Sequence, residues 1–216
     1  MDEVGEDLRR VDEALRLVDR EIWVVTAAEG ERRGGLVATW VSSASIDARR
    51  PVLLIGLAPN HFTTELVQAG KAFGAHLLRA DQTELAWNFA NGSGRARDKL
   101  AGLAFERRET GAPILADCLA WFDCRVFARY DAGDRLFFWG DVVAGGHSTP
   151  HAPREDGITR SRPAERVPWP TMLLREQAFF RSLSEEQRQV LVADKAADAA
   201  QNRPLHESWR KRTNLA

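Results

Sequence analysis

Apolar residues recur with a helical period near the N-terminus, and helix is expected again from Thr171 onward. In this C-terminal part Ser184 and Gln187 have the spacing of a helix-initiating capping box. The N-terminal stripe predicts an amphipathic helix. Its members are Val4, Leu8, Val11, Leu15 and Val18.

Between these ends, short apolar runs predict strands. The runs 22–27 and 36–42 flank a polar, glycine-bearing connection, which is typical of a hairpin. The run 51–58 is almost continuously apolar, which is typical of a strand buried on both faces. Residues 73–78 form a fourth run, so this half of the chain is rich in strands.

Two short helices are expected among these strands. Asn60 is placed as the N-cap of a helix over 61–68. Asp81 and Glu84 have capping-box spacing for a second helix that continues to Phe89. A short helical piece is also expected over 98–103.

The stretch 118–130 alternates apolar and polar residues and is expected to pair with 134–145 across a tight turn. Cys118 and Cys124, the only cysteines, fall on one face at an even spacing, which favours buried free thiols over a metal or redox motif. The two faces of the predicted strand carry Ala120, Phe122, Cys124, Val126 and Ala128 on one side and Asp123, Arg125 and Arg129 on the other.

From 147 to 169 the chain has no periodicity and is expected to be a long loop. His147, His151 and Glu155 are spaced by fours, but Pro150 and Pro153 prevent the helix that would align them. We therefore predict no metal site.

Six or seven strands, mostly in hairpins, with helices at both ends indicate a closed antiparallel barrel. Residues 1–20 are the N-terminal helix and residues 21–147 the barrel domain. Residues 148–170 are the loop and residues 171–216 a helical extension.

Composition narrows the class of protein. With 216 residues, of which 44% are hydrophobic, the chain can bury one substantial core. The net charge of −1 argues against nucleic-acid or anionic-membrane partners. The longest apolar run is too short to span a bilayer, and the acidic N-terminus does not resemble a signal peptide, so a cytoplasmic location is expected.

Candidate chemistry lies at the end of the second strand and the start of the following helix. Hydroxyls on Ser42, Ser43 and Ser45 form a shelf that suits a planar polar ring or a phosphate. His61, Thr63 and Thr64 lie in a helix's first turn, where backbone N–H groups favour an anion. Each feature alone also has a purely structural reading, as turn former or cap.

The order of these motifs resembles the flavin reductase-like, FMN-binding split-barrel family. The resemblance rests on "WVVTA", "GGLVATWVSSASIDARRPVLLIGLA", "HFTTELVQAGKAFGAHLL" and "GAPILADCLAWFDCRVFARYDAGDRLFFWGDVV", and it covers roughly residues 20–145. It implies a six-stranded antiparallel Greek-key split β-barrel, mainly β with peripheral helices. It also implies a homodimer with FMN at the interface and NADH or NADPH as co-substrate.

The resemblance also implies a set of ligand-binding positions. The ring would lie against the strand Ala38, Thr39, Trp40, Val41 and Ser42. The ribityl chain and phosphate would meet Ser43, Ser45, Thr63 and Thr64, with His61, Phe89, Ser93 and Arg95 nearby. The glycines around Ser93 do not form a dinucleotide fingerprint, because the third glycine is missing and the stretch follows a helix.

Two departures from the family pattern bear on activity. "DARRP" stands where reductases of the family usually have "DPP", and only a histidine remains of a later histidine-proline-leucine motif. His147 matches that histidine and is the candidate catalytic residue.

The resemblance thus implies an NAD(P)H-linked flavin reductase, with a separate monooxygenase as the candidate recipient of its reduced flavin. One alternative is an enzyme that keeps its FMN and acts on an organic substrate. Another is a barrel that binds flavin or haem without turnover.

Overall fold

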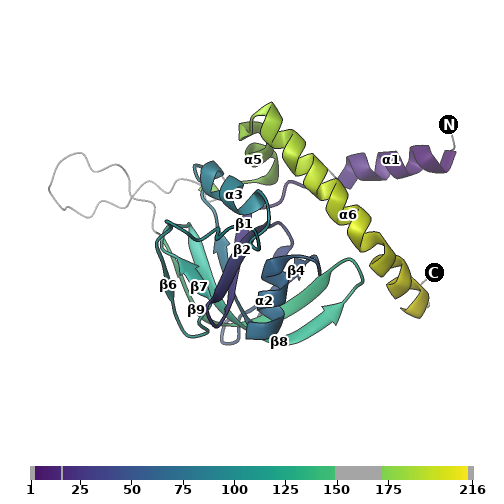
Figure 1. Ribbon diagram of the computed structural model, residues 1–216. Helices are drawn as coiled ribbons and strands as arrows, with labels where there is room; N and C mark the ends of the chain where they lie inside the picture. Colours follow the sequence, from purple (N-terminus) through teal and green to yellow (C-terminus); the bar gives the residue numbers. More distant parts are fainter. Residues whose placement is uncertain (1–2, 16, 149–171, 214–216) are drawn as a thin grey trace.

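The computed structural model describes residues 3–15, 17–148 and 172–213, and its main feature is one antiparallel sheet of seven strands (Figure 1). In sheet order the strands are β2 (Arg32–Ala38), β1 (Trp23–Glu29), β5 (Ala72–Leu77), β8 (Ala120–Asp131), β9 (Leu136–His147), β4 (Val52–Leu57) and β3 (Val41–Ser43). The prediction of a mainly β fold is confirmed. The predicted number of six strands is wrong, because the run 36–42 breaks at Thr39 and Trp40 and its second part forms β3.

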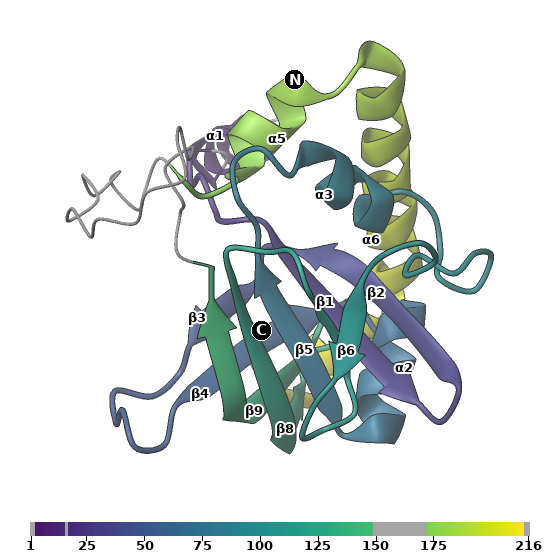
Figure 2. The ribbon, with the colours of Figure 1, turned by 90° about the vertical axis from the view of Figure 1, so that its left-hand side faces the viewer.

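The chain itself forces this sheet to curl. β2 ends at Ala38 and β3 begins at Val41, yet the two strands lie at opposite edges of the sheet. Three residues of chain span at most about 11 Å, so the two edges must approach each other at this point. Figure 2 shows the curl, with the strands wrapped as a half-barrel.

Side chains on the inner face of the curled sheet form the main core. Val25 on β1, Ile55 on β4, Phe73 on β5 and Phe138 on β9 are almost completely buried. Gly140 of β9 makes room for the Phe73 ring, because a Cβ on Gly140 would lie 2.7 Å from Phe73 Cε1. The apolar alternation of the predicted strands thus indicated the core correctly.

β8 departs from the alternation predicted for it. A β-bulge between Asp123 and Cys124 places both side chains in the interior. Asp123 was predicted on the polar face, but its carboxylate accepts hydrogen bonds from the Thr110 backbone N–H, at 3.0 Å, and from the Thr110 hydroxyl. Cys118 and Cys124 are buried free thiols, as predicted, and burial raises both pKa values, that of Cys118 to about 12.

Two short helices cover the sheet, with start signals that differ from those predicted. α2 (Phe62–Gly70) has His61 rather than Asn60 at its N-cap, and no side chain caps it. α3 (Thr83–Ala90) begins after Gln82, so the predicted Asp81–Glu84 capping box is wrong; Asp81 pairs instead with Arg79. Residues 98–103 form turns rather than the expected helix.

A small second sheet, β6 (Phe105–Arg107) with β7 (Pro113–Leu115), was not predicted. The predicted N-terminal helix is α1 (Glu3–Leu15), and it projects away from the sheet in Figure 1. Its apolar residues Leu8, Val11 and Leu15 are more than half exposed.

The C-terminal part joins the sheet and then folds back as two helices. The backbone of Leu174 joins the segments before β1 and after β5. Its carbonyl accepts a hydrogen bond from the Ile22 N–H at 2.8 Å, and its N–H donates to the Leu78 carbonyl at 3.0 Å. α5 (Glu176–Ser182) buries Phe179 in a second apolar cluster under α3. α6 (Glu185–Thr213) starts at the predicted capping box of Ser184 and Gln187, which is confirmed by reciprocal hydrogen bonds of 2.8 and 3.2 Å.

No helix in the described ranges is long and apolar enough to cross a bilayer.

Candidate functional site

The predicted serine shelf lies on the surface at the edge of the curled sheet. Ser42 and Ser43 pair with Leu54 and Leu53 of β4, and both are exposed. Their hydroxyls make only long local bonds, 3.2 Å from Ser42 Oγ to Ser43 O and 3.4 Å from Ser43 Oγ to Ser45 O. Ser45 Oγ accepts from the Asp47 N–H and so supports the turn. The Ser42 and Ser43 hydroxyls therefore face solvent with capacity for a ligand.

Trp40, which links β2 to β3, forms an aromatic wall beside this shelf. Its ring stacks on Phe137 of β9 at 6.1 Å with 9° between the planes, and Arg135 lies 5.0 Å over it. Gly56 of β4 lies beneath both rings, and a Cβ there would come within 2.9 Å of Phe137 and 3.0 Å of Trp40. The wall is 40% exposed at Trp40, so a flat ligand can reach it. Phe137, Arg135 and Gly56 were not predicted as site residues.

Next to Trp40 and the serines, the chain offers mainly backbone groups, from Ala38, Thr39 and Val41. Ala38 is buried in the core and Val41 packs against it, while Thr39 is half-buried. The β3 edge is free for further pairing among the described residues, because β4 is the only strand paired with β3 there. Exposed backbone groups at such an edge suit the polar rim of a planar ring.

The start of α2 is held by the C-terminal helix, a contact that the sequence did not predict. His61 Nε2 lies 2.6 Å from Asp198 Oδ2, and Asn60 Nδ2 donates to Asp198 Oδ1 and to Gln201 Oε1, each at 2.9 Å. Asn202, buried on α6, donates to Asn60 Oδ1 at 3.1 Å. These residues lie about 140 positions apart in the chain, and no local pattern links them.

Thr63 and Thr64, expected near a phosphate, are buried on the inner side of α2. The Thr64 hydroxyl donates to the Ala58 carbonyl at 2.7 Å. Phe89 is also buried, under α3, and lies against Gly35, where a Cβ would come within 2.6 Å of its ring. Direct contact of these three side chains with a ligand stays a prediction, and in one chain all three face the interior.

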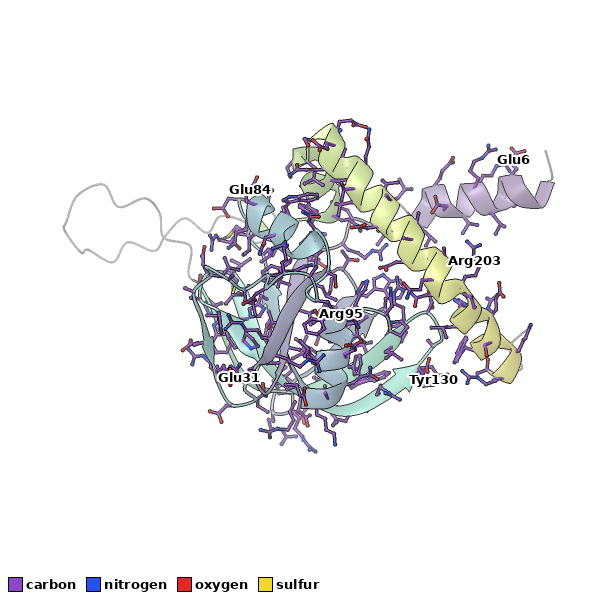
Figure 3. The ribbon with its side chains drawn as sticks, viewed as in Figure 1. Glu6, Glu31, Glu84, Arg95, Tyr130 and Arg203 are labelled. Atoms are coloured by element: carbon purple, nitrogen blue, oxygen red, sulfur yellow. The ribbon has the colours of Figure 1, made fainter. Side chains whose placement is uncertain are left out.

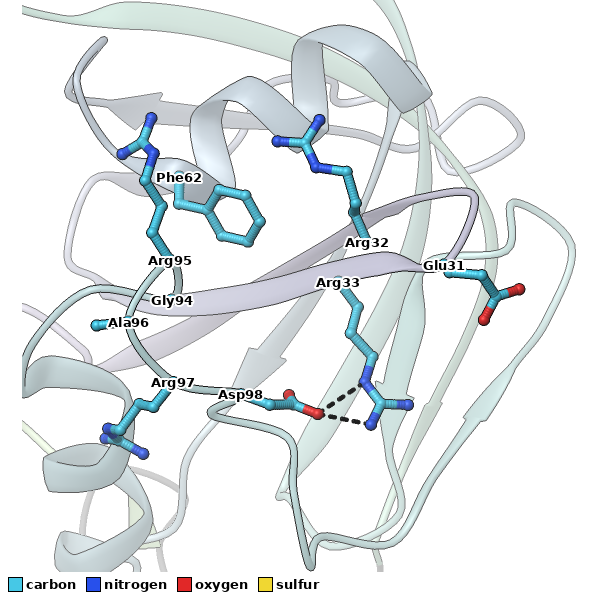
Figure 4. Close-up of a pocket in the computed structure, with 9 residues that line it drawn as sticks. All are labelled: Glu31, Arg32, Arg33, Phe62, Gly94, Arg95, Ala96, Arg97 and Asp98. Atoms are coloured by element: carbon cyan, nitrogen blue, oxygen red, sulfur yellow. Dashed lines mark hydrogen bonds and ion pairs between the residues drawn. The ribbon is translucent and has the colours of Figure 1, made fainter.

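A recess of about 500 Å³ lies where α2, the loop after α3 and the start of β2 meet (Figure 4). Arg95 reaches across it to the Asn60 carbonyl at 3.2 Å and to the Glu65 carboxylate. Ser93 accepts from the Arg95 N–H and shapes the turn. We call this recess the arginine pocket, and its lining residues are Glu31, Arg32, Arg33, Phe62, Gly94, Arg95, Ala96, Arg97 and Asp98.

An ion pair and a buried lysine lie at the edge of the arginine pocket. Arg33 Nε and Nη2 both donate to Asp98 Oδ2, at 3.1 and 2.6 Å, and this lowers the pKa of Asp98. The next residue, Lys99, is buried and donates to the Phe89 carbonyl at 2.8 Å. Burial lowers the pKa of Lys99 to about 8, helped by the charge of Arg97 and opposed by Asp194 of α6.

The predicted site residues therefore form separate groups within one chain. Ser43 pairs with Leu53, which lies about 13 Å along β4 from the end of the strand at Leu57, and α2 begins five residues later at Phe62. Within one chain the serines and the two threonines thus lie on separate segments, and their convergence on one ligand stays a prediction. Trp40 is nearer to α2, because its carbonyl accepts from Gly56 N–H at 2.9 Å.

His147, the candidate catalytic residue, ends β9 opposite Ala120. The shelf meets β9 at Gly140, so seven residues, about 23 Å of strand, separate His147 from it. His147 therefore does not contact the serines of its own chain directly, and its catalytic role stays a prediction. His151 and Glu155 lie outside the described residues, and the described part contains no metal-binding cluster of histidine, cysteine or acidic residues.

The residues present fit a flavin. A planar ring finds the aromatic wall of Trp40 and Phe137, exposed backbone and two serine hydroxyls, while an anion finds arginines beyond the start of α2. The buried indole N–H of Trp23, in register with Ala38, has no acceptor among the described residues. A curled antiparallel sheet with such an edge site belongs to the class of ligand-binding split barrels.

Comparison with known proteins defines the family. The family model described as "Flavin reductase like domain" matches residues 15–163. The chain therefore belongs to the flavin reductase-like family, as its sequence predicted. "FMN reductase (NADH) SmoA" of Agrobacterium fabrum is 32% identical over 143 residues, which are 66% of this chain and 79% of that protein. The matched range contains the whole sheet but neither α5 nor α6.

Two further proteins show the range of the family. The structure of an FMN-binding protein from Thermus thermophilus with bound 1-cyclohex-2-enone has a TM-score of 0.55 and 26% identity, and it covers 60% of this chain and 71% of that one. "Diflavin flavoprotein A 1" of Synechocystis sp. is 26% identical over 136 residues, 62% of this chain but 23% of that protein. The chain thus spans about a quarter of the diflavin flavoproteins that it matches.

Proposed function

We propose that this chain binds FMN and acts as an NAD(P)H:flavin oxidoreductase. The observation that carries the proposal is the family match over residues 15–163. The similarity to an FMN reductase (NADH) over two thirds of the chain supports it. The exposed aromatic wall and serine hydroxyls supply a fitting surface for the ring.

The residues have distinct roles in this proposal. Trp40, stacked on Phe137, offers its exposed side to the flat ring, and Ser42 and Ser43 hydrogen-bond the polar edge of that ring. When bound, the flavin supplies the hydride-accepting chemistry, and the chain contributes orientation and a polar setting.

We further propose that the chain works as a homodimer with the ligand between two copies. Leu54, Phe137 and Trp139 lie on the outer face of β4 and β9 beside Trp40, and all are only partly buried. A second copy that covers this face would enclose the ring from the other side. A second copy would also be the source from which His147 reaches the shelf.

The direct test is a visible spectrum of the purified full-length chain, followed by anaerobic addition of NADH or NADPH. We expect a flavin spectrum, either as purified or after reconstitution with FMN, that bleaches on addition of at least one nicotinamide coenzyme. A colourless protein that does not take up FMN would refute the proposal, and a flavin spectrum that neither coenzyme bleaches would refute its reductase part.

A second candidate is an enzyme that keeps its FMN and reduces an organic substrate. The Thermus thermophilus relative with a bound cyclic enone favours this reading. Anaerobically bleached protein that regains its flavin spectrum on addition of cyclohexenone, but does not transfer electrons to free FMN, would support it over the first candidate.

A further inference from the structure

The apolar stripe of helix α1 is left open to solvent by the described part of its own chain. Leu8, Val11 and Leu15 lie on one side of the helix at steps of three and four, and each is more than half exposed. Burial of three large apolar side chains in line would lower the free energy of the molecule. We therefore expect α1 to dock on another surface.

The attachment of α1 keeps this stripe away from the rest of the chain. A turn continues past the helix, because the Val18 N–H donates to the Leu15 carbonyl at 3.2 Å. Asp19 is then bonded to the start of α5, since its carbonyl accepts from Arg175 at 2.7 Å and its carboxylate from the Gln177 N–H at 2.9 Å. α1 consequently projects outward in Figure 1, and α5 lies between α1 and α6 in the view of Figure 2.

α6 carries an exposed stripe of matching spacing, on a different side from Asn202, which contacts the start of α2. Val192, Ala196, Ala199 and Arg203 recur at steps of four, three and four, and all four are exposed. The stripe spans about 17 Å, against about 20 Å for the whole of α1. Because its alanines are small, the larger apolar side chains of α1 can pack between its turns.

Charge on the two helices is complementary. Over residues 6–15 of α1, two arginines and four carboxylates give a formal charge of −2 (two minus four). Over residues 203–213 of α6, three arginines and one lysine outweigh Glu207 and give +3 (four minus one). Antiparallel docking aligns the two helix dipoles favourably and brings Glu6 and Asp7 close to Arg203. Two copies of α1 packed on each other would instead bring like charges together.

We propose that α1 of one copy docks on the exposed stripe of α6 of a second copy, and the second copy's α1 on the first. This reciprocal exchange is the isologous arrangement of a twofold dimer. Leu8 and Val11 of one copy then lie level with Ala199 and Ala196 of the other. The inference rests on the second copy that the proposed function invokes, but it needs no flavin, and it uses α6, which lies outside the family match.

The first test is disulfide trapping between two full-length chains with different tags. Cys118 and Cys124 are buried, so new surface cysteines react selectively. We expect Val11→Cys in one chain and Ala196→Cys in the other to cross-link under mild oxidation. With Ala197→Cys, the matched control, cross-linking should be roughly tenfold slower, because this exposed alanine lies about 100° further round α6.

Equal cross-linking rates at the two α6 positions would overturn the inference. A chain that carries both Val11→Cys and Ala196→Cys, and that cross-links only to itself, would overturn it as well, because α1 would then dock within its own chain.

The second test measures the dimer dissociation constant by analytical ultracentrifugation. Leu8→Glu combined with Leu15→Glu should raise this constant about tenfold, or roughly 1.4 kcal/mol, because carboxylates replace the apolar contacts. Leu17→Glu is the control, since Leu17 is also apolar and exposed but lies outside α1. Thermal melts establish that each variant is folded.

An unchanged dissociation constant in the double variant would overturn the inference and leave the proposed dimer through β4 and β9 intact. A wild type that stays monomeric would overturn both. Loss of the dimer in the double variant, with FMN still taken up by the monomer, would support the inference and contradict only the placement of the ligand between two copies.

Discussion

At the scale of single residues, Gly56 is the position on which the aromatic wall depends. In Gly56→Ala the new methyl group would lie 2.9 Å from Phe137 Cε1 and 3.0 Å from Trp40 Cε3, so at least one ring must move. We expect FMN affinity to fall about tenfold, or roughly 1.4 kcal/mol, measured by flavin fluorescence titration. Unchanged affinity, with urea unfolding unaltered, would show that the stacked rings do not hold the ligand.

His76 gives a pH dependence that belongs to one buried side chain. Its Nε2 accepts from Leu115 N–H at 3.0 Å, so Nδ1 carries the proton and donates to the Val24 carbonyl at 3.0 Å. Burial lowers the pKa of His76 from 6.5 to about 4. Between these values the unfolded chain binds a proton that the folded chain does not, so stability is lost as pH falls from 6.5 towards 4.

We therefore expect the wild type to lose about 2 kcal/mol more stability than His76→Gln between pH 7.5 and 4.5. Urea unfolding of both proteins at the two pH values measures this, and subtraction removes the contribution of the carboxylates, which is common to both. Parallel pH profiles for the two proteins would mean that another group dominates the acid sensitivity.

At the scale of secondary-structure elements, α6 is attached mainly through polar contacts. Its middle is bonded to Asn60 and His61, and its last turns meet the β8–β9 turn. There, His206 Nδ1 lies 3.3 Å from Asp134 and Trp209 packs edge-on against Tyr130. Figure 3 shows Tyr130 beside this part of the helix.

Gly133 lets α6 approach the β8–β9 turn. A Cβ there would lie 2.7 Å from the His206 Cα and 2.9 Å from the Leu205 carbonyl oxygen. Gly133→Ala should therefore release the C-terminal half of α6 and speed amide hydrogen exchange over it. Gly102→Ala is the matched control, because Gly102 also has a positive φ, of 76°, but open space around its Cβ. Similar exchange in both variants would contradict the predicted docking.

The strands were predictable from the sequence because each buries an alternating or continuous apolar run in one core. β1, β4 and β5 and the β8–β9 hairpin follow directly from that pattern. β3 was not separable from β2, since its independent pairing arises only when the curled sheet brings its edges together. The contact between α6 and α2 could not be predicted from the sequence either. Asp198 and Asn202 have no distinguishing local pattern, and they meet Asn60 only in the folded chain.

The residues of the candidate site were also only partly predictable from the sequence. Trp40 and the serines follow one another in the chain, so a local motif could indicate them. Phe137 and Gly56 meet Trp40 only through strand pairing, and Arg32 and Glu65 meet Arg95 only through the packing of α2. The burial of Thr63 and Thr64 could not be predicted from the sequence, because residues in a first helical turn can face either solvent or the core, and both face the core here.

At the scale of the whole molecule, the distance along β9 between His147 and the shelf has a consequence for assembly. About 23 Å of strand separates His147 from Gly140, the residue in line with Ser43. If the proposed dimer is the catalytic unit and His147 serves it, each site combines Trp40 of one copy with His147 of the other. Trp40→Ala and His147→Ala should then each abolish most NAD(P)H:flavin activity as pure proteins.

Co-expression of the two variants with different tags tests this arrangement. A mixed dimer holds both lesions in one site and none in the other, so random pairing should restore about a quarter of wild-type activity. Mixed dimers isolated through both tags should have about half. If mixed dimers form but stay inactive, Trp40 and His147 do not meet across the interface; if His147→Ala alone is fully active, the histidine has no catalytic role and the shelf works without it.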